Sequence, residues 1–389
     1  MAVPISYNIR NVRQRWQVTL LAIVGIAMVV AVFTVIMSMS EGFRLALRAT
    51  GRDDNAIIVQ RGSASELTSG VPLDQRNQII VDDRVARGSD GQPLASWDWV
   101  IVISAPKATD GAPTNVTFRA VPQKAYEVRG GIEIVEGRKY TAGLDEVIVG
   151  KRLTDRIQGM HLGGTVKYQK KEFKIVGIFT NDGGAFESEI WGDYDVIGAL
   201  FQRGPGSNSL VVRMKDAKDI PALDRWIRDQ PQMQLQALSE KKYYADQAGP
   251  TAGALKGLAR LVAIIMGIGA VFGAMNTMYA IVAARTREIG TLRALGFSRT
   301  SILLSFVLES VFLALVAGVI GCLLAFPMNG FSTGTGQTQS FSEIAFAFRI
   351  TPPILVVGMV FALIMGLVGG LLPAWRGAKM PITTALREA

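Results

Sequence analysis

The chain has 389 residues, of which 49% are hydrophobic and 19% are charged, and its formal net charge is +9. Soluble domains usually carry charge on about a quarter of their residues. The single cysteine, Cys322, excludes an intrachain disulfide, and the single histidine, His161, excludes a multi-histidine metal site. Because no Ser–His–Asp arrangement is plausible around His161, we predict no metal site and no catalytic residues.

The positive charge is concentrated in three short segments that flank long uncharged runs. Residues 1–15, 284–300 and 373–389 together hold ten basic and two acidic residues, which accounts for +8 of the net +9. Basic residues beside membrane spans are retained on the cytoplasmic side, so we predict that both termini are cytoplasmic. The rest of the chain is nearly neutral and offers no basic patch, which argues against nucleic-acid binding.

The first long uncharged run extends from Trp16 to Ser40, after the predicted cytoplasmic N-terminus at 1–15. A helix needs about 20 apolar residues to cross a bilayer, so residues 16–40 are predicted to form the first transmembrane helix. The alternative is a cleaved signal peptide, whose apolar region is only about 7–15 residues long. This run is longer, and no small-x-small cleavage site follows it before Glu41, so we expect it to be retained.

Residues 41–253 are predicted to form a folded extracytoplasmic domain of the α+β class. The segment holds short β-rich runs bounded by turn residues, with helical stretches at Lys151–Ile157 and Pro221–Gln230. Its apolar content suffices for one domain of about 200 residues, in one or two lobes. The predicted strands are Ala56–Gln60, Gln78–Val81, Trp99–Ser104, Asn115–Val121, Glu146–Val149, Thr165–Tyr168, Phe173–Phe179 and Ser209–Met214.

Both ends of this domain are predicted to continue as helix toward the adjacent membrane spans. Glu41–Arg48 follows the first span with helical spacing, and Ser239–Gln247 precedes the second span. Such helices would act as stalks that carry motion between the membrane and the outer domain. The alternative is ordinary juxtamembrane helix that frays into loop. Because proline disturbs the helix around it, we expect a break at Gly249–Pro250.

Two pairs of carboxylates lie in the second half of the outer domain, Glu187 with Glu189 and Asp193 with Asp195. Paired carboxylates can serve in catalysis or bind calcium. These pairs lack the spacing of an EF-hand calcium loop. We therefore expect all four side chains to be solvated at the surface.

Three further transmembrane helices are predicted after the outer domain, each from an apolar run long enough to span the bilayer. The predicted fold class is therefore a membrane protein with four transmembrane α-helices in a 1 + 3 arrangement. The large α+β extracytoplasmic domain is inserted between helices 1 and 2. The predicted segments after it are transmembrane helix 254–284, cytoplasmic connection 285–299, transmembrane helix 300–326, extracytoplasmic loop 327–352, transmembrane helix 353–373 and cytoplasmic C-terminus 374–389.

Two groups of residues within the spans are candidates for function. The second span contains Gly267, Gly269 and Gly273, small residues that let helices approach closely, either within one chain or between two copies. The third contains Glu309, and a carboxylate within a span is costly and a functional candidate by default. We expect Glu309 to pair with an arginine on the cytoplasmic side and to take part in transmembrane coupling. The alternative is a hydrated residue near the membrane surface.

The cytoplasmic connection is predicted to contain an amphipathic helix at Arg285–Leu295, directly followed by a glycine that ends it. Ser298 can then cap the next helix. The periodicity places Ile289, Leu292 and Leu295 near one face, and such a face could dock into a groove of a cytosolic partner. A basic loop that only sets the topology is equally compatible with the periodicity.

Several stretches resemble the FtsX/MacB-type ABC permeases over nearly the whole chain. The cytoplasmic connection RTREIGTLRALGFSR, followed by an apolar span containing Glu309, is similar to that family, as is the C-terminal PAWRGAKMPITTALRE. In the outer domain, EVIVGKRLTDRI, KYQKKEFKIVGIF and EIWGDYDVI resemble the MacB-type periplasmic core domain. The resemblance implies that the cytoplasmic connection is the coupling helix that contacts the ATPase. The coupling residues it implies are Arg285, Arg287, Glu288, Ile289, Gly290, Leu292, Arg293, Leu295, Gly296 and Glu309.

The resemblance also implies the partners of the chain. The sequence contains no G-x-x-x-x-G-K-[ST] phosphate-binding loop, so we expect ATP and Mg²⁺ to be bound by two separate cytosolic ABC ATPase subunits and no cofactor by this chain. A second permease copy or a paralogue, a periplasmic adaptor protein and membrane lipids complete the expected set of partners. The chain is then a non-enzymatic subunit of the bacterial inner membrane.

The function implied by the resemblance is mechanotransmission, in which ATP hydrolysis moves the outer domain and drives export or efflux on the outer side. Extraction of lipoproteins from the inner membrane is an alternative within the same class. Another alternative is a transmembrane activator of a cell-wall hydrolase, which the size of the outer domain disfavours. A membrane-anchored sensor without an ATPase is disfavoured by the coupling helix.

Overall fold

The computed structural model describes residues 16–336 and 342–381. The chain divides into two compact units. A helical unit contains Met1–Glu41, Ala254–Phe331 and Phe348–Ala389, and a second unit, here called the core domain, contains Gly42–Gly253 and Ser332–Ala347. The predictions for the basic segment 1–15 and for the second half of the C-terminal segment 374–389, residues 382–389, fall outside the described residues.

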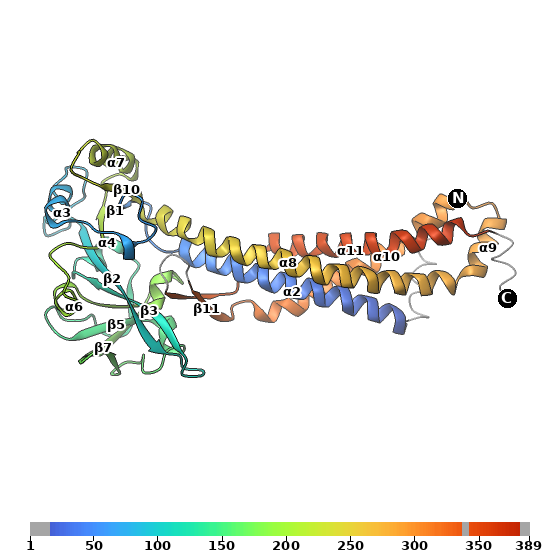
Figure 1. Cartoon of the computed structure of the whole chain (residues 1–389), viewed down its shortest axis with the longest axis horizontal. Coiled ribbons are helices and arrows are strands. Elements are labelled where there is room, and N and C mark those ends of the chain that lie inside the picture. The colour runs from blue at the N-terminus through green and yellow to red at the C-terminus, as the bar shows by residue number, and fades with distance from the viewer. Residues whose placement is uncertain (1–15, 337–341, 382–389) are drawn as a thin grey trace. The chain divides into compact units, whose positions relative to one another are not determined.

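Four long helices supply the helical unit (Figure 1). Each of them is long and apolar enough to cross a membrane. The core domain is inserted between the first and the second, so the predicted 1 + 3 arrangement is confirmed. The four helices are α2 (Trp16–Arg48), α8 (Glu240–Ala283), α10 (Arg299–Ala325) and α11 (Pro352–Lys379), and a short helix α9 (Thr286–Ala294) joins α8 to α10.

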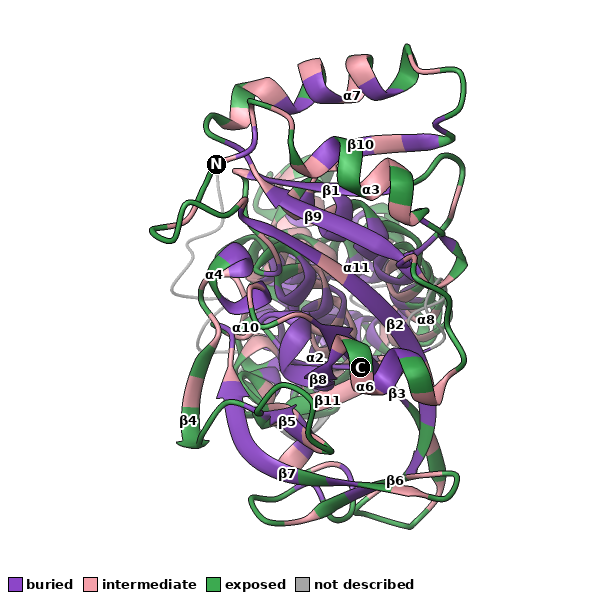
Figure 2. Cartoon of the chain, turned by 90° about the vertical axis from the view of Figure 1, so that its left-hand side faces the viewer, coloured by how far each residue is buried: buried purple, intermediate pink, exposed green. Residues whose placement is uncertain are grey.

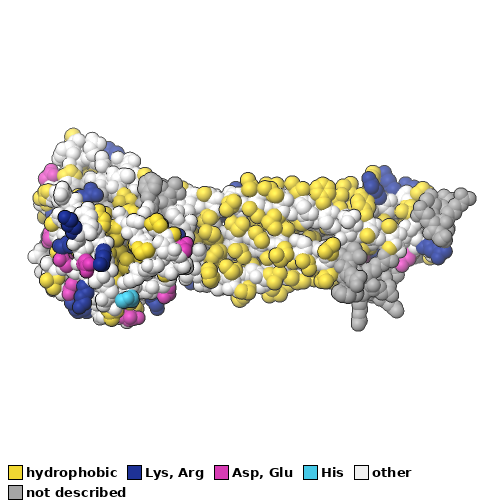
Figure 3. All heavy atoms as spheres, turned by 60° about the horizontal axis from the view of Figure 1, so that its bottom comes forward, with side chains coloured by type: hydrophobic (Ala, Val, Ile, Leu, Met, Phe, Trp, Pro, Cys, Tyr) yellow, Lys and Arg dark blue, Asp and Glu magenta, His cyan; other side chains and the backbone are white. Residues whose placement is uncertain are grey.

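The outer surface of these helices is strongly apolar. Figure 3 shows hydrophobic side chains spread over the helical unit, with few charges between them. Leu21, Ile264 and Phe272 expose 74%, 63% and 63% of their surface. A soluble protein rarely exposes so large a contiguous apolar surface, and lipid is the solvent that suits it.

The first two long helices extend beyond the helical unit into the core domain. Helix α2 continues to Arg48, so Glu41–Arg48 is helical as predicted. Helix α8 begins at Glu240, one residue after the predicted start at Ser239, which ends β10. The expected break at Gly249–Pro250 is wrong, because α8 is continuous through Pro250. Proline usually excludes helical geometry at the preceding residue by contact with its Cβ atom. The preceding residue here is Gly249, which has no Cβ.

The core domain is built on a ten-stranded mixed sheet, with α7 packed beside β10. The strand order is β10-β1-β9-β2-β3-β8-β5-β7-β4, with β6 also paired to β7; only the β3–β8 and β5–β7 pairs are parallel. The strands are β1 (Asn55–Gln60), β2 (Ala95–Pro106), β3 (Pro113–Val121), β4 (Glu133–Gly137), β5 (Glu146–Gly150), β6 (Thr165–Tyr168), β7 (Lys171–Thr180), β8 (Glu189–Asp193), β9 (Ser209–Arg213) and β10 (Leu235–Ser239). The short helices are α3 (Leu73–Ile80), α4 (Ala125–Arg129), α5 (Lys151–Thr154), α6 (Tyr194–Leu200) and α7 (Ile220–Arg228), with 3-10 turns η1 (Glu66–Thr68), η2 (Ala185–Ser188) and η3 (Ala217–Asp219).

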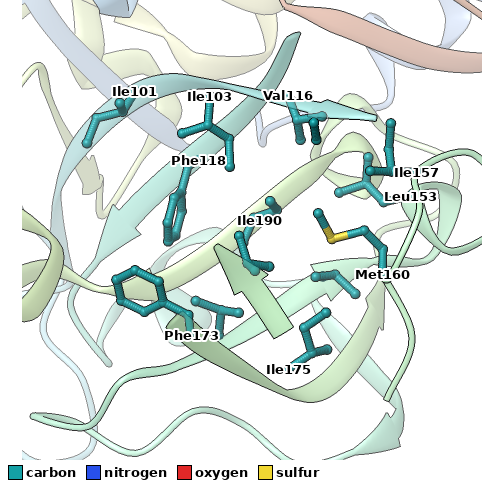
Figure 4. Packing of buried hydrophobic residues seen from close by; sticks show 14 of the residues in the cluster. Ile101, Ile103, Val116, Phe118, Leu153, Ile157, Met160, Phe173, Ile175 and Ile190 are labelled. Atoms are coloured by element: carbon teal, nitrogen blue, oxygen red, sulfur yellow. The ribbon is translucent and has the colours of Figure 1, made fainter. Parts of the chain in front are cut away.

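Two clusters of buried hydrophobic side chains stabilise the core domain. Figure 2 shows that much of the central strands is buried. The larger cluster lies on β2, β3, β5, β7 and β8, and its side chains point toward one another in Figure 4. Phe118 and Phe173 meet there edge to face, with ring centroids 5.5 Å apart. The smaller cluster joins β1, β9 and β10 to α3 and α7. One continuous sheet carries both clusters, and the domain forms a single compact unit.

The structure corrects several details of the predicted outer domain. Residues Gln78–Val81 were expected to form a strand, but they overlap the end of α3. Helix α3 starts directly after Pro72, and proline is common at helix starts. Its residue Ile79 is buried. Helix α5 ends at Thr154 rather than at Ile157. Ile157 nevertheless belongs to the larger hydrophobic cluster.

The predicted extracytoplasmic loop between α10 and α11 contains a hairpin that the sequence analysis missed. Strands β11 (Ser332–Gly336) and β12 (Glu343–Ala347) pair antiparallel to each other. A 3-10 turn, η4 (Phe326–Met328), leads into it from α10. The hairpin belongs to the core domain rather than to the helical unit.

Candidate coupling site at helix α9

The α8–α9–α10 connection is held by local hydrogen bonds that agree with the sequence. Helix α9 ends at Ala294, and Gly296 follows it with φ +91°, a backbone conformation that favours glycine. The hydroxyl oxygen of Ser298 then caps α10 by accepting a hydrogen bond from the backbone N–H of Ser301, at 3.1 Å. The predicted helix stop and cap are both confirmed.

A buried arginine joins this connection to the third membrane-spanning helix. The guanidinium of Arg285 donates to Glu309 Oε2 at 2.9 Å and to Glu288 Oε2 at 2.9 Å. It also lies over the ring of Phe306, 4.9 Å from the centroid. The side chains of Arg285 and Glu309 expose only 7% and 3% of their surface. The expected arginine partner of Glu309 is therefore Arg285, and the pair links the start of α9 directly to α10.

The inner face of α9 packs on the helical unit itself. Ile289 is 2% exposed and belongs to a cluster with residues of α8, α10 and α11. The neighbouring Gly290 is also buried, and Leu292 and Arg293 are half-buried. The expectation that Ile289 and Leu292 share a docking face with Leu295 is therefore wrong for Ile289. The helices of this chain already occupy that side of α9, so its most apolar residue is used for intrachain packing.

The outer face of α9 is the one that a partner can reach. Arg287, Glu288, Thr291, Ala294 and Leu295 are all exposed, and their spacing places them on one side of the helix. Leu295 exposes 71% of its surface at the end of this face. The face combines two charges, a hydroxyl and a projecting leucine. It is the candidate docking surface, and we call it the outer face of α9.

The candidate packing glycines divide into two groups. A Cβ atom at Gly267 would lie 3.2 Å from the ring of Phe361 in α11, so this glycine serves packing within the chain. At Gly269 and Gly273 a Cβ would meet nothing within 4 Å. The last two glycines line an apolar groove between α8 and α2, together with Gly25 and Val29.

A buried charge cluster in the core domain was missed in the sequence analysis. Arg119 is 1% exposed and forms ion pairs with Glu66, Asp98 and Glu189, with N–O distances of 2.9, 3.1 and 2.7 Å. Arg129 is also buried and pairs with Asp98 and with Glu240, the first residue of α8. The cluster therefore anchors the start of α8 to the sheet.

Three of the four carboxylates that were expected at the surface are buried, so this prediction is wrong for them. Glu187, Glu189 and Asp193 expose 5%, 8% and 6% of their surface, and only Asp195 is exposed. Glu187 accepts hydrogen bonds from backbone N–H groups of the turn before it, Glu189 pairs with Arg119, and Asp193 caps α6. These partners offset the cost of burying charge, and nothing in the local sequence indicates them.

Acid is expected to destabilise the core domain through Glu66. Burial alone would raise the pKa of this carboxyl, but the charge and hydrogen bonds of Arg119 lower it from 4.5 to about 2. Its stabilising contribution is therefore complete above about pH 4.5 and is lost as the pH falls toward about 2. Thermal unfolding followed over this range should have a smaller pH slope in Glu66→Gln than in the native chain. Glu172→Gln, which removes an exposed carboxylate, should keep the native slope; equal slopes in all three would contradict the assignment.

Among the residues that the structure describes, no group of three or more His, Cys, Asp or Glu side chains is arranged to hold a metal ion. The chemistry of the α9 site is that of charge pairing and helix docking. Its single buried ion pair connects a surface helix to a membrane-spanning helix. Such a site can transmit a displacement.

Comparison with known proteins identifies two domain families in the chain. The MacB-like periplasmic core domain matches residues 19–230, and the FtsX-like permease C-terminal domain matches residues 260–382. The "Uncharacterized ABC transporter permease YvrN" of Bacillus subtilis is 24% identical over 94% of this chain and 93% of its own length. The "Uncharacterized ABC transporter permease MJ1507" of Methanocaldococcus jannaschii is 28% identical over 70% of each chain.

Longer relatives and solved structures are also similar. The "Macrolide export ATP-binding/permease protein MacB" of Neisseria gonorrhoeae is 21% identical over 70% of this chain and 44% of its own length. The crystal structure of the periplasmic region of MacB from Actinobacillus actinomycetemcomitans is 12% identical, with a TM-score of 0.37, over 50% of this chain and 92% of that one.

Proposed function

The chain belongs to the FtsX- and MacB-like ABC transporter permeases, and from this we propose that it is the permease subunit of an exporter driven by separate cytosolic ATPase subunits. The observation that carries the proposal is the outer face of α9, which is exposed while the helix behind it is tied to α10 by the Arg285–Glu309 ion pair. The longer MacB relatives are named ATP-binding/permease proteins.

In the proposed mechanism, two ATPase subunits each contact the α9 of one permease, and the second permease is another copy or a paralogue. ATP binding brings the ATPases together and displaces α9. The Arg285–Glu309 pair passes the displacement to α10, and the continuous helices α2 and α8 pass it to the core domain. The cargo is handled on the outer side with a periplasmic adaptor.

The proposal requires that ATP hydrolysis resides in a partner. The purified chain should hydrolyse no ATP, whereas a tagged copy expressed in its native host should retain an ABC ATPase through purification. The retained complex should hydrolyse ATP in lipid. ATP hydrolysis by the isolated chain, or purification without any ABC ATPase, would rule the proposal out.

In the proposed topology, the chain lies in the bacterial inner membrane, with both termini and α9 on the cytoplasmic side. Single cysteines at the exposed positions Ser89 and Ala142, in a Cys322→Ser background, should react with an impermeant thiol reagent in cells with a permeabilised outer membrane. A cysteine at the exposed Thr300, beside α9, should react only after the inner membrane is opened. The reverse pattern would invert the orientation.

A further inference from the structure

The hairpin between α10 and α11 is held to the core domain by a buried strand. In β12, Ile344, Ala345 and Phe346 expose 6%, 2% and 0% of their surface. The ring of Phe346 meets that of Phe43 edge to face, with centroids 5.5 Å apart. The backbone N–H of Ala345 donates to the hydroxyl of Ser188 at 2.9 Å. A strand this deeply packed belongs structurally to the core domain, although the chain reaches it from membrane-spanning helices.

Glu343 adds a polar attachment at the start of the same strand. Its carboxylate pairs with Arg156, lies 3.6 Å from the ammonium of Lys107 and accepts a hydrogen bond from the Thr114 hydroxyl at 2.5 Å. Lys107 and Thr114 belong to the β2–β3 hairpin and Arg156 follows α5, so the carboxylate joins two segments of the core domain. A Cβ atom at Gly334 in β11 would lie 2.1 Å from Glu343 Oε1. The glycine on the paired strand therefore leaves the space that the ion pair occupies.

The hairpin is the third covalent connection between the core domain and the membrane-spanning helices. The first two are α2 and α8, which are uninterrupted helices. The third leaves the end of α10, the helix that carries Glu309 near its other end, and returns to α11. Besides the path through α2 and α8, a displacement of α10 therefore has a direct path to the core domain, as long as the hairpin remains attached to it.

We propose that the β11–β12 hairpin is a tie that transmits displacement of α10 and α11 to the core domain, and that Glu343 is the positioning residue that keeps it attached. The inference rests on the proposed function, because it requires a nucleotide-driven displacement. Membrane-side motion then enters the core domain through three connections. The tie contributes through its contacts with the core domain and touches neither nucleotide nor cargo.

The test uses the full permease–ATPase complex in lipid and compares hydrogen exchange of core-domain peptides without nucleotide and after trapping with ATP and vanadate. In the native complex, nucleotide should change the exchange of these peptides. In Glu343→Arg, which places a third positive charge beside Arg156 and Lys107, this change should become clearly smaller while ATP hydrolysis continues, because α2 and α8 still connect the two parts. Glu172→Arg, which alters an exposed carboxylate of the same domain, should behave as the native complex does.

A disulfide provides the control for general damage to the fold. Because Ser188 and Ala345 are in contact, cysteines at both positions in a Cys322→Ser background can reattach the hairpin independently of charge. In the Glu343→Arg protein that carries this pair, oxidation should restore the nucleotide-dependent change to its native size and reduction should lower it again.

The outcomes separate the tie from the function on which it rests. No nucleotide-dependent change in the native complex would overturn the proposed function itself. A change of native size in Glu343→Arg would overturn the tie alone. A reduction that oxidation does not reverse would also overturn the tie, because it would show damage that reattaching the hairpin cannot correct.

Discussion

Changing two residues on the outer face of α9 is expected to separate the permease from its ATPase. Arg287→Glu reverses an exposed charge, and Leu295→Ala removes the projecting leucine. Truncating an interface hot spot costs about 2 kcal/mol or more, so Leu295→Ala alone should raise the dissociation constant roughly thirtyfold. The charge reversal adds repulsion and slows association. Affinity measured between the purified permease in nanodiscs and its ATPase gives the result directly.

Two choices make this experiment specific for the docking surface. Glu288 is kept, because it contacts Arg285 and its change would disturb the buried pair. Ile289→Val serves as the control, since Ile289 packs inside the helical unit. It should lower the stability of the chain by about 1 kcal/mol and leave ATPase affinity unchanged. Native affinity in the Arg287→Glu/Leu295→Ala protein, or weakened affinity in the control only, would show that α9 docks through another face.

Removing the carboxylate of Glu309 is expected to cost both stability and coupling. Glu309→Ala removes the buried carboxylate that pairs with Arg285, while the exposed Glu288 still pairs with the same guanidinium. Breaking a buried ion pair by removing one partner costs about 3–5 kcal/mol, and we expect the lower end because Glu288 remains. Glu309→Gln should be milder, since the amide oxygen still accepts a hydrogen bond from the guanidinium. Thermal unfolding of the purified chain measures the first effect.

The coupling effect can be separated from stability by a double replacement. Arg285→Met with Glu309→Leu substitutes apolar side chains for both charges, and replacement of a whole buried pair is often neutral or stabilising. This protein should unfold near the native temperature and still bind the ATPase. It should nevertheless show little nucleotide-dependent change in the core domain. If the double replacement shows the native nucleotide-dependent change in the core domain, the ion pair has only a structural role.

The gross architecture follows from the amino-acid sequence because its causes are local. A bilayer requires about 20 consecutive apolar residues for a helix, and four such runs can be counted without knowledge of any contact. The stop at Gly296 and the cap at Ser298 depend on the conformation of single residues and their immediate neighbours. The sequence predicted core-domain strands where apolar and polar residues alternate between clear turn residues, as at β2 and β7.

The site itself was decided by contacts between residues far apart in the chain. Periodicity identified α9 as amphipathic, but only packing shows that Ile289 faces the chain's own helices and that Leu295 faces outward. Glu309 was recognisable from the cost of a carboxylate in a membrane span. That its partner is Arg285, 24 positions away, depends on how α8, α9 and α10 pack.

The sequence by itself could not determine which charged residues are buried or that β11 and β12 form a hairpin. A glutamate such as Glu189 is usually solvated, and its burial became possible because β3 places Arg119 beside it. Glu343 directly follows an uncharged run, within the segment 327–352 that was predicted as a loop. Its role depends on Arg156 and Lys107, which come from another part of the chain. Local chemistry determined the membrane spans, the inserted domain and the amphipathic helix α9. Long-range packing alone decided which charges are buried and which face of α9 is exposed, because the cost of burying a charge is offset only when the fold brings its partner to it.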